Sequence, residues 1–153
     1  MNVFLTGASS GIGAAMAREF GRRGARLGLV ARRADALRQL ADEMPGRCDC
    51  YPLDVTDHDA LIAAAQDFEA RCGGTDIVVA NAGISTGILT EHQEDLAGFE
   101  RVIATNLIAA AATFIHSSHR CVRVGAAPWS ESPALRGSAD YPVPRPTPRP
   151  RPP

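Results

Sequence analysis

A glycine-rich turn between a short apolar run and a helical pattern constrains the fold of this chain more than any other feature. The run covers Asn2–Thr6. Beyond the turn, Ile12, Met16 and Phe20 recur at helical spacing. Residues 6–13, which join the two patterns, read TGASSGIG. The order of strand, glycine turn and helix predicts a βαβ unit, in which the next strand runs parallel to the first.

The spacing of the glycines in this turn suits a bound anion. Gly7 permits a sharp exit from the strand, Gly11 lets the backbone approach a pyrophosphate, and Gly13 lets the helix pack near the sheet. Free N–H groups at the start of the helix attract negative charge, and Ser9 and Ser10 can add hydroxyl donors. The turn therefore predicts a dinucleotide phosphate site, and a tight turn without a ligand is the alternative.

Strand and helix patterns keep alternating after this unit. Further strands are expected at residues 26–31, 48–53 and 76–80. Helical patterns separate them, with Asp57 as the N-cap of Ala60–Arg71, and a long apolar helix is expected over Leu96–His116. The sequence thus predicts an α/β fold, a doubly wound parallel sheet with helices on both faces.

Composition excludes several other classes of protein. With 153 residues, of which 45% are hydrophobic and 22% charged, the chain has the size and composition of one globular domain. Its formal net charge of -1 provides no basic field, so no nucleic-acid partner is expected. Residues 102–115, the most apolar stretch, are interrupted by Thr105 and Asn106 and are too short to span a bilayer, so no membrane partner is expected.

The cysteines predict neither a metal site nor a disulfide framework. Cys48 and Cys50 lack a second pair, or a histidine, at the spacing of a zinc site. No secretory signal precedes the first strand, so we expect reduced thiols and a cytoplasmic location.

Two motifs in register resemble the short-chain dehydrogenase/reductase family. The cofactor motif of that family, TGxxxGxG, matches this chain residue for residue from Thr6 to Gly13. Asp54 and Val55 follow the third expected strand, where the family has an acidic residue that contacts the adenine ring. The resemblance implies a Rossmann-like fold with a dinucleotide as cofactor. A helix-approach aspartate without a ligand is the alternative for Asp54.

Two further motifs extend the resemblance to about residue 115. Asn81, Ala82 and Gly83 match the NAG motif of the family, which supports the sheet and lines the nicotinamide side. Asn106, inside the long expected helix, matches the asparagine that organises a proton-relay water in the catalytic site of the family. An asparagine in an apolar helix carries a desolvation cost unless it is hydrogen-bonded, which also indicates a specific role.

The end of the second expected strand discriminates between cofactors. An acidic residue there accepts hydrogen bonds from the 2′-hydroxyl of NAD, whereas arginine neutralises the 2′-phosphate of NADP. This chain has Arg32 and Arg33 after Ala31, which favours NADP over NAD, with a merely solvated arginine pair as the alternative. The expected cofactor-binding residues are Thr6, Gly7, Ser9, Ser10, Gly11, Ile12, Gly13, Arg32, Arg33, Asp54, Val55, Asn81, Ala82 and Gly83.

The C-terminal part of the chain departs from the pattern of the family. The resemblance implies a tyrosine as general acid/base, and Tyr141 stands in a similar run, GSADY. A free phenol titrates near 10, so it needs an adjacent cation to act as a base, which the family supplies as a lysine four residues later. Arg145 has that spacing, but prolines intervene and the sequence contains no lysine. Ser130 and Ser132 are displaced candidates for the serine that holds the substrate.

Three functions therefore stay open. The first is an NADP-dependent oxidoreductase of an alcohol or carbonyl substrate, with Asn106 and Tyr141 as catalytic residues. The second is a non-catalytic NADP-binding fragment, and the third is an interaction module that uses a disordered proline-rich tail at residues 142–153. We expect a dinucleotide-binding domain over residues 1–125, an irregular segment over 126–141, and self-association through an uncovered sheet edge and helix face.

Overall fold

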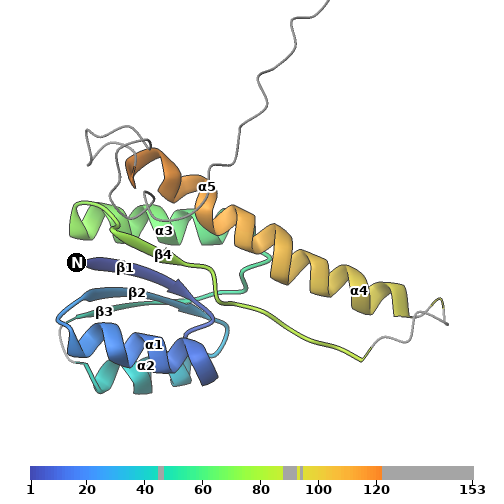
Figure 1. The fold of residues 1–153 in the computed structure, drawn as a ribbon, viewed down its shortest axis with the longest axis horizontal. Helices are drawn as coiled ribbons and strands as arrows, with labels where there is room; N and C mark the ends of the chain where they lie inside the picture. The colour runs from blue at the N-terminus through green and yellow to red at the C-terminus, as the bar shows by residue number, and fades with distance from the viewer. Residues whose placement is uncertain (45–46, 88–92, 94, 122–153) are drawn as a thin grey trace, which may run out of the picture.

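The computed structural model describes residues 1–44, 47–87, 93 and 95–121, which form a sheet with helices on both faces (Figure 1). All strand pairs are parallel, in the order β3-β2-β1-β4. The strands are β1 (Asn2–Thr6), β2 (Arg26–Ala31), β3 (Cys48–Pro52) and β4 (Ile77–Val79). The helices are α1 (Gly11–Arg22), α2 (Ala34–Asp42), α3 (His58–Cys72), α4 (Asp95–Ile103), the π-helical η1 (Ala104–Ile108) and α5 (Ala109–Cys121). The expected doubly wound parallel sheet is confirmed.

Strand β1 lies inside the sheet because its side chains are buried on both faces. Val3 and Leu5 belong to the apolar cluster formed with α1 and α2. Phe4, between them, points to the opposite face and contacts Phe68 of α3, with ring centroids 5.8 Å apart. This alternation follows from the two-residue period of a strand, and each fully buried side chain of this size contributes about 1.5–3 kcal/mol. The glycine-rich turn after β1 is thereby held at the middle of the carboxyl edge of the sheet.

Helix α1 packs through small residues rather than through the whole expected apolar face. Its buried residues are Gly13, Ala14 and Ala17. Ile12, which shares the helical spacing of Met16 and Phe20, is 73% exposed at the first turn. The small buried residues let the start of the helix approach the sheet closely, so Ile12 is left facing the space beyond the strand ends.

Helix α3 begins and ends where local sequence signals place its termini. The carboxylate of Asp57 accepts a hydrogen bond from the N–H of Ala60 at 3.1 Å, which confirms Asp57 as the N-cap. Gly73 follows the helix in a left-handed conformation, with φ of 80°, which only glycine adopts at little cost. Both signals are local, so the sequence carries them without help from tertiary contacts.

Elements α4, η1 and α5 form one long helix, as expected for residues 96–116, but with a π-helical segment inside it. The outer end, α4, projects beyond the carboxyl ends of the strands, whereas α5 lies against α3 (Figure 1). A π-helical turn contains an additional residue and is often found at functional sites. In this chain it contains Asn106, the asparagine singled out from the sequence.

The long helix is apolar but poorly covered. Leu96, Phe99, Leu107 and Ile108 are all about half exposed or more. The apolar stretch at 102–115 belongs to a longer helical segment, Asp95–Ile115, whose length of 21 residues and mean hydropathy of 1.3 would suffice to cross a membrane. Core helices of soluble proteins can have the same length and composition. In this chain, however, only 22% of the most apolar part of Asp95–Ile115 is buried.

Several expectations concern residues outside the described part of the chain. Helix α5 continues to Cys121, five residues beyond the end expected at His116. Residues 126–141 with Tyr141 and the proline-rich segment 142–153 are among the residues that the structure does not describe.

Candidate functional site

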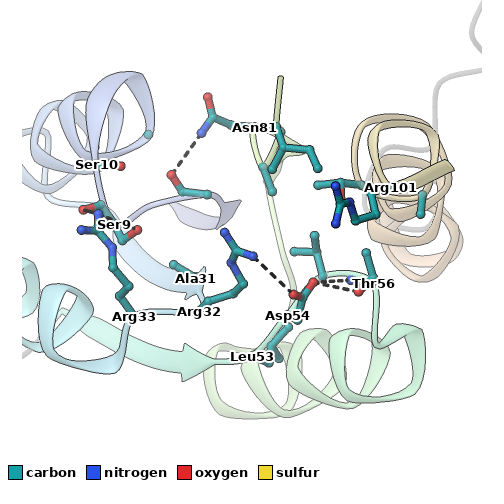
Figure 2. Close-up of a pocket in the computed structure, with 18 of the residues that line it drawn as sticks. Ser9, Ser10, Ala31, Arg32, Arg33, Leu53, Asp54, Thr56, Asn81 and Arg101 are labelled. Carbon is teal, nitrogen blue, oxygen red and sulfur yellow. Dashed lines mark hydrogen bonds and ion pairs between the residues drawn. The ribbon is translucent and has the colours of Figure 1, made fainter. Parts of the chain in front are cut away.

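A cavity of about 730 Å³ opens at the carboxyl ends of the strands. Because β1 is followed on one side by β2 and on the other by β4, the loops after β1 and β4 diverge to opposite faces of the sheet, which leaves a crevice there. Figure 2 shows this crevice between the start of α1, the loop after β3 and the inner side of α4. Its lining residues are Gly7, Ser9, Ser10, Ile12, Gly13, Ala31, Arg32, Arg33, Leu53, Asp54, Val55, Thr56, Asn81, Ala82, Gly83, Ile84, Arg101, Ala104 and Thr105.

The first wall of the cavity is the glycine-rich turn. A Cβ atom on Gly13 would lie 2.1 Å from the carbonyl oxygen of Gly7, and one on Gly7 would lie 2.8 Å from the backbone of Ala82. Both positions therefore require glycine. The first turn of α1 has no side-chain cap and no acidic residue, so its N–H groups are open to an anion from solvent.

The Thr6 hydroxyl and the Asn81 amide join the turn after β1 to the turn after β4. The hydroxyl oxygen accepts hydrogen bonds from the N–H groups of Asn81 and Ala82, each at 3.1 Å. In return, the Asn81 amide donates to the carbonyl oxygens of Thr6 and Gly7, each at 3.2 Å. Asn81 and Ala82 line the cavity while Thr6 is buried behind it. Each of the two sequence motifs thus contributes one side chain, Thr6 or Asn81, that holds the two turns together.

Asn106 holds the same region from the side of the long helix. Its Oδ1 accepts from the N–H of Ile84 at 2.8 Å, and its Nδ2 donates to the carbonyl oxygen of Ile84 at 2.9 Å. This pair of hydrogen bonds occupies the amide with the backbone of the loop after β4. Asn106 is exposed and does not itself line the cavity.

The two arginines after β2 lie on the side of the cavity facing α1 and the β3 loop. The guanidinium of Arg33 donates to the carbonyl oxygen of Ser9 at 3.2 Å. The guanidinium of Arg32 lies 3.8 Å from the carboxylate of Asp54, and both side chains are largely exposed. An ion pair of this kind contributes about 0–1 kcal/mol, so little free energy is needed to redirect Arg32 toward another anion.

Asp54 is fixed by its own loop. Its Oδ1 accepts from the N–H of Thr56 at 3.0 Å and from the Thr56 hydroxyl at 2.8 Å. The backbone hydrogen bond in particular holds the pKa of Asp54 below its usual value, with smaller contributions in the same direction from the Thr56 hydroxyl and Arg32. The carboxylate is therefore ionised at neutral pH and is oriented before any ligand arrives.

Most of the residues expected to bind a cofactor come together around this cavity. Two of them do not line it: Thr6 lies behind the glycine-rich turn, and Gly11 is exposed at the start of α1. Asn106, the first expected catalytic residue, is exposed and does not line the cavity either. Tyr141, the second expected catalytic residue, lies outside the described residues. The fold therefore brings most of the expected cofactor-binding residues to one cavity.

Sequence reasoning missed the wall that α4 and η1 provide. Arg101, Ala104 and Thr105 line the cavity from this helix, at the offsets i, i+3 and i+4 that share one helical face. Their spacing was available in the sequence. No local sequence pattern indicated that this face of the helix, rather than another, would face the carboxyl ends of the strands.

The site has the geometry of a dinucleotide-binding crevice, and comparison with known proteins decides the family. The model of a family described as short chain dehydrogenase matches residues 1–119. The chain belongs to the short-chain dehydrogenase family. The Rossmann-like fold expected from the sequence is accordingly confirmed for the matched part.

Curated short-chain dehydrogenase relatives are similar to this chain over its N-terminal part. A fatty acyl-CoA reductase of Mycobacterium tuberculosis is 41% identical over 111 residues, which are 70% of this chain and 38% of the relative. The probable NADP-dependent dehydrogenase of Dichelobacter nodosus is 38% identical over 106 residues, 69% of this chain and 100% of the relative. Apart from such short relatives, the chain spans less than half the length of the first curated relatives that it matches.

Solved structures of short-chain dehydrogenases have the same fold. A metagenomic short-chain oxidoreductase in complex with NADP superimposes with a TM-score of 0.73 at 33% identity, over 80% of this chain and 57% of the other. This likeness shows a fold that holds NADP in that oxidoreductase.

Proposed function

We propose that this chain is the NADP-binding part of a short-chain oxidoreductase and that it binds NADP in preference to NAD. The observation that carries the proposal is the pair Arg32 and Arg33, both of which line the cavity directly after β2. No carboxylate stands at that strand end, where one would be needed to accept hydrogen bonds from a free ribose 2′-hydroxyl. The solved relative that holds NADP supports the same choice.

The residues around the cavity fit a dinucleotide. The uncapped N–H groups at the start of α1 would hold the pyrophosphate, and a Cβ on Gly11 would meet nothing within 4 Å, so the approach to them is open. Arg33 would bind the 2′-phosphate from its position beside Ser9, with Arg32 turning from Asp54 toward the same group. Asn81–Gly83 would line the nicotinamide end. The bound cofactor supplies a hydride donor or acceptor.

We infer that an alcohol or carbonyl compound is the substrate class of the whole enzyme. The support comes from the relatives, one of which is named a fatty acyl-CoA reductase.

This chain alone is proposed to bind the cofactor without turnover. The Asn106 amide is engaged by the backbone of Ile84, and the sequence provides no lysine to lower the pKa of a tyrosine such as Tyr141. We also propose a cytoplasmic location, because Cys48, Cys50 and Cys72 are free thiols in the described part of the chain.

Calorimetric titration with NADP and NAD tests the binding proposal. A charge-assisted contact to the additional phosphate is worth about 1.5–3 kcal/mol, so NADP should bind roughly ten- to a hundredfold more tightly. Substituting both Arg32→Ala and Arg33→Ala should lower the affinity for NADP to that for NAD. Arg38→Ala is the matched control, since Arg38 is an exposed arginine of α2 that pairs with Asp35 away from the cavity. Equal affinities of the unsubstituted chain for both cofactors would exclude the NADP preference.

A hydride-transfer assay over a panel of alcohols and carbonyl compounds tests the absence of turnover. The change in absorbance of NADPH should stay at the rate of the control without protein. A rate of about 1–1,000 per second, in the range of ordinary enzymes, would contradict the proposal.

A further inference from the structure

Arg101 is a third arginine at the cavity, and it enters from a different element than Arg32 and Arg33. It lies on α4, which projects past the carboxyl ends of the strands (Figure 1), and it lines the cavity. Figure 2 shows its guanidinium directed into the cavity, on the side of Thr56 and away from Ser9 and Arg33. The position is therefore separate from the corner where the 2′-phosphate is proposed to bind.

The guanidinium of Arg101 makes no hydrogen bond or ion pair with the described residues. Each arginine side chain within residues 1–44 and 47–87 contacts a carboxylate or a carbonyl oxygen, as Arg26 contacts Asp49 and Arg47 contacts Gly24. Asp54, the carboxylate that faces Arg101 across the cavity, is already bonded to Thr56 and paired with Arg32. Pairing with a carboxylate of the described residues thus does not account for Arg101.

Small and apolar side chains line part of the cavity near Arg101. On its own helix, Ala104 and Thr105 present small side chains to the cavity one turn further along. On the opposite side the loop after β3 contributes the apolar Leu53 and Val55, with the polar pair Asp54 and Thr56 beside them. A flat ring that enters between these walls would meet the guanidinium plane of Arg101 at the outer end.

The placement of the ribose decides which ring that is. If the residues after β2 hold the ribose that carries the 2′-phosphate, the base attached to that ribose lies over the end of β3, the next strand of the sheet. Leu53 and Val55 follow β3 directly. The base of the dinucleotide would therefore lie between the β3 loop and α4.

We propose that Arg101 stacks its guanidinium plane on the adenine ring of the bound dinucleotide and closes the outer side of the adenine subsite. The inference rests on the proposed cofactor function. Arginine is suited to this role because its planar, delocalised cation stacks on aromatic faces and is more weakly hydrated than an ammonium group. Arg101 is then a positioning residue, which acts on affinity through the base and not through the phosphates.

Calorimetry on the full chain with Arg101→Met tests the proposal, because methionine keeps an unbranched stem and removes the planar cation. Affinities for NADP, NAD and 2′,5′-ADP should all fall by about the same factor, three- to tenfold, and the ratio of NADP to NAD affinity should stay unchanged. The loss should persist between about 0.05 M and 0.5 M NaCl, since a stacking contact is screened less than a phosphate contact. Glu100→Gln, a neighbouring exposed position of α4 that does not line the cavity, is the control and should change nothing.

The alternative outcomes separate this inference from the proposed function. Unchanged affinity of the Arg101→Met chain, where the unsubstituted chain binds NADP, would overturn the role of Arg101 and leave the cofactor proposal standing. A loss confined to the two ligands with a 2′-phosphate would also overturn it, because Arg101 would then contact that phosphate. An unsubstituted chain that binds none of the three ligands would overturn the cofactor proposal itself. Circular dichroism of each variant establishes that it is folded.

Discussion

Of the glycines in the glycine-rich turn at residues 6–13, Gly13 leaves the least space for a side chain. A Cβ there would lie 2.1 Å from the Gly7 carbonyl oxygen, a backbone atom that cannot rotate away. We expect Gly13→Ala to lower the free energy of unfolding by about 1–3 kcal/mol, the usual cost of overpacking, and to weaken NADP binding as the turn shifts. Urea denaturation followed by circular dichroism measures the first effect.

Gly87→Ala is the matched control for Gly13→Ala. A Cβ on Gly87 would meet nothing within 4 Å. The free energy of unfolding should therefore change by no more than about 0.5 kcal/mol. If both variants are equally stable, the close approach of α1 to the turn after β1 is not rigid.

Tyr51 gives the stability of the chain an alkaline pH dependence. Burial, and then the hydrogen bond that its hydroxyl donates to Asp67 at 2.7 Å, raise the pKa of Tyr51 above its ordinary value. An acid whose pKa is raised by folding stabilises the folded state below its unfolded pKa, near 10, and that stabilisation is lost as the pH rises further. Tyr51→Phe should therefore be less stable than the unsubstituted chain at pH 8, and this difference should shrink toward pH 11.

The comparison of the two chains isolates Tyr51 from the thiols. Burial raises the pKa of Cys48 to about 11, so Cys48 also makes the folded state less stable in alkali, but equally in both chains. Urea denaturation at several pH values between about 8 and 11 gives the difference curve. A difference that stays constant over this range would show that Tyr51 titrates normally.

Single residues differ in how far the sequence could place them. Arg32 and Arg33 were predictable as cavity residues because they follow a strand directly, and parallel strands end at the same edge. Arg101 was not, because its position depends on how α4 crosses that edge, which no local pattern encodes. The spacing of Ile12, Met16 and Phe20 suggested one apolar face, but the close packing of Gly13, Ala14 and Ala17 leaves Ile12 at the cavity instead.

Among the elements, α3 depends on a single side-chain cap at its N-terminus. The Asp57 carboxylate accepts from the N–H of Ala60, so Asp57→Ala should lower the free energy of unfolding by about 0.5–2 kcal/mol. Asp59→Ala removes an exposed carboxylate from the same first turn without removing the cap, and its effect should be a few tenths of a kcal/mol. Thermal and urea denaturation of the two variants measure the difference, and equal losses would assign the effect to charge alone.

The boundaries of the strands and of the first three helices follow from patterns of a few residues, but the π-helical segment does not. Residues 27–31 are uncharged throughout and stand between Arg26 and the pair Arg32 and Arg33, so local sequence is sufficient there. Within Leu96–Ile115 the apolar spacing continues through η1, and the change of helix type coincides with the two hydrogen bonds of Asn106 to Ile84. That contact joins residues 22 positions apart and therefore lay beyond any reasoning from periodicity.

At the scale of the whole molecule, the exposed side of the long helix makes association the expected behaviour. Leu107 and Ile115 are 61% and 64% exposed, and β4 has no strand beyond it among the described residues. Apolar surface and an open strand edge both favour contacts between molecules. Light scattering of the unsubstituted chain should therefore give a mass above that of the monomer, and Leu107→Lys together with Ile115→Lys should lower it.

A lysine elsewhere on the same helix controls for added charge. Ala111 is exposed on α5, so Ala111→Lys adds charge without removing a large apolar side chain. It should leave the mass closer to that of the unsubstituted chain. A monodisperse monomer for the unsubstituted chain would contradict the prediction.

The shared hydroxyl of Thr6 has a kinetic consequence. Its oxygen accepts hydrogen bonds from the N–H groups of Asn81 and Ala82, which follow Thr6 by 75 and 76 positions in the sequence. The turns after β1 and β4 are therefore joined only after these two strands have paired. Contacts of such long sequence separation form late in folding, because the intervening chain must first be ordered. During synthesis, the nucleotide could thus be captured only once β4 has emerged. In refolding experiments, the appearance of nucleotide affinity would mark the completion of the sheet and not its nucleation.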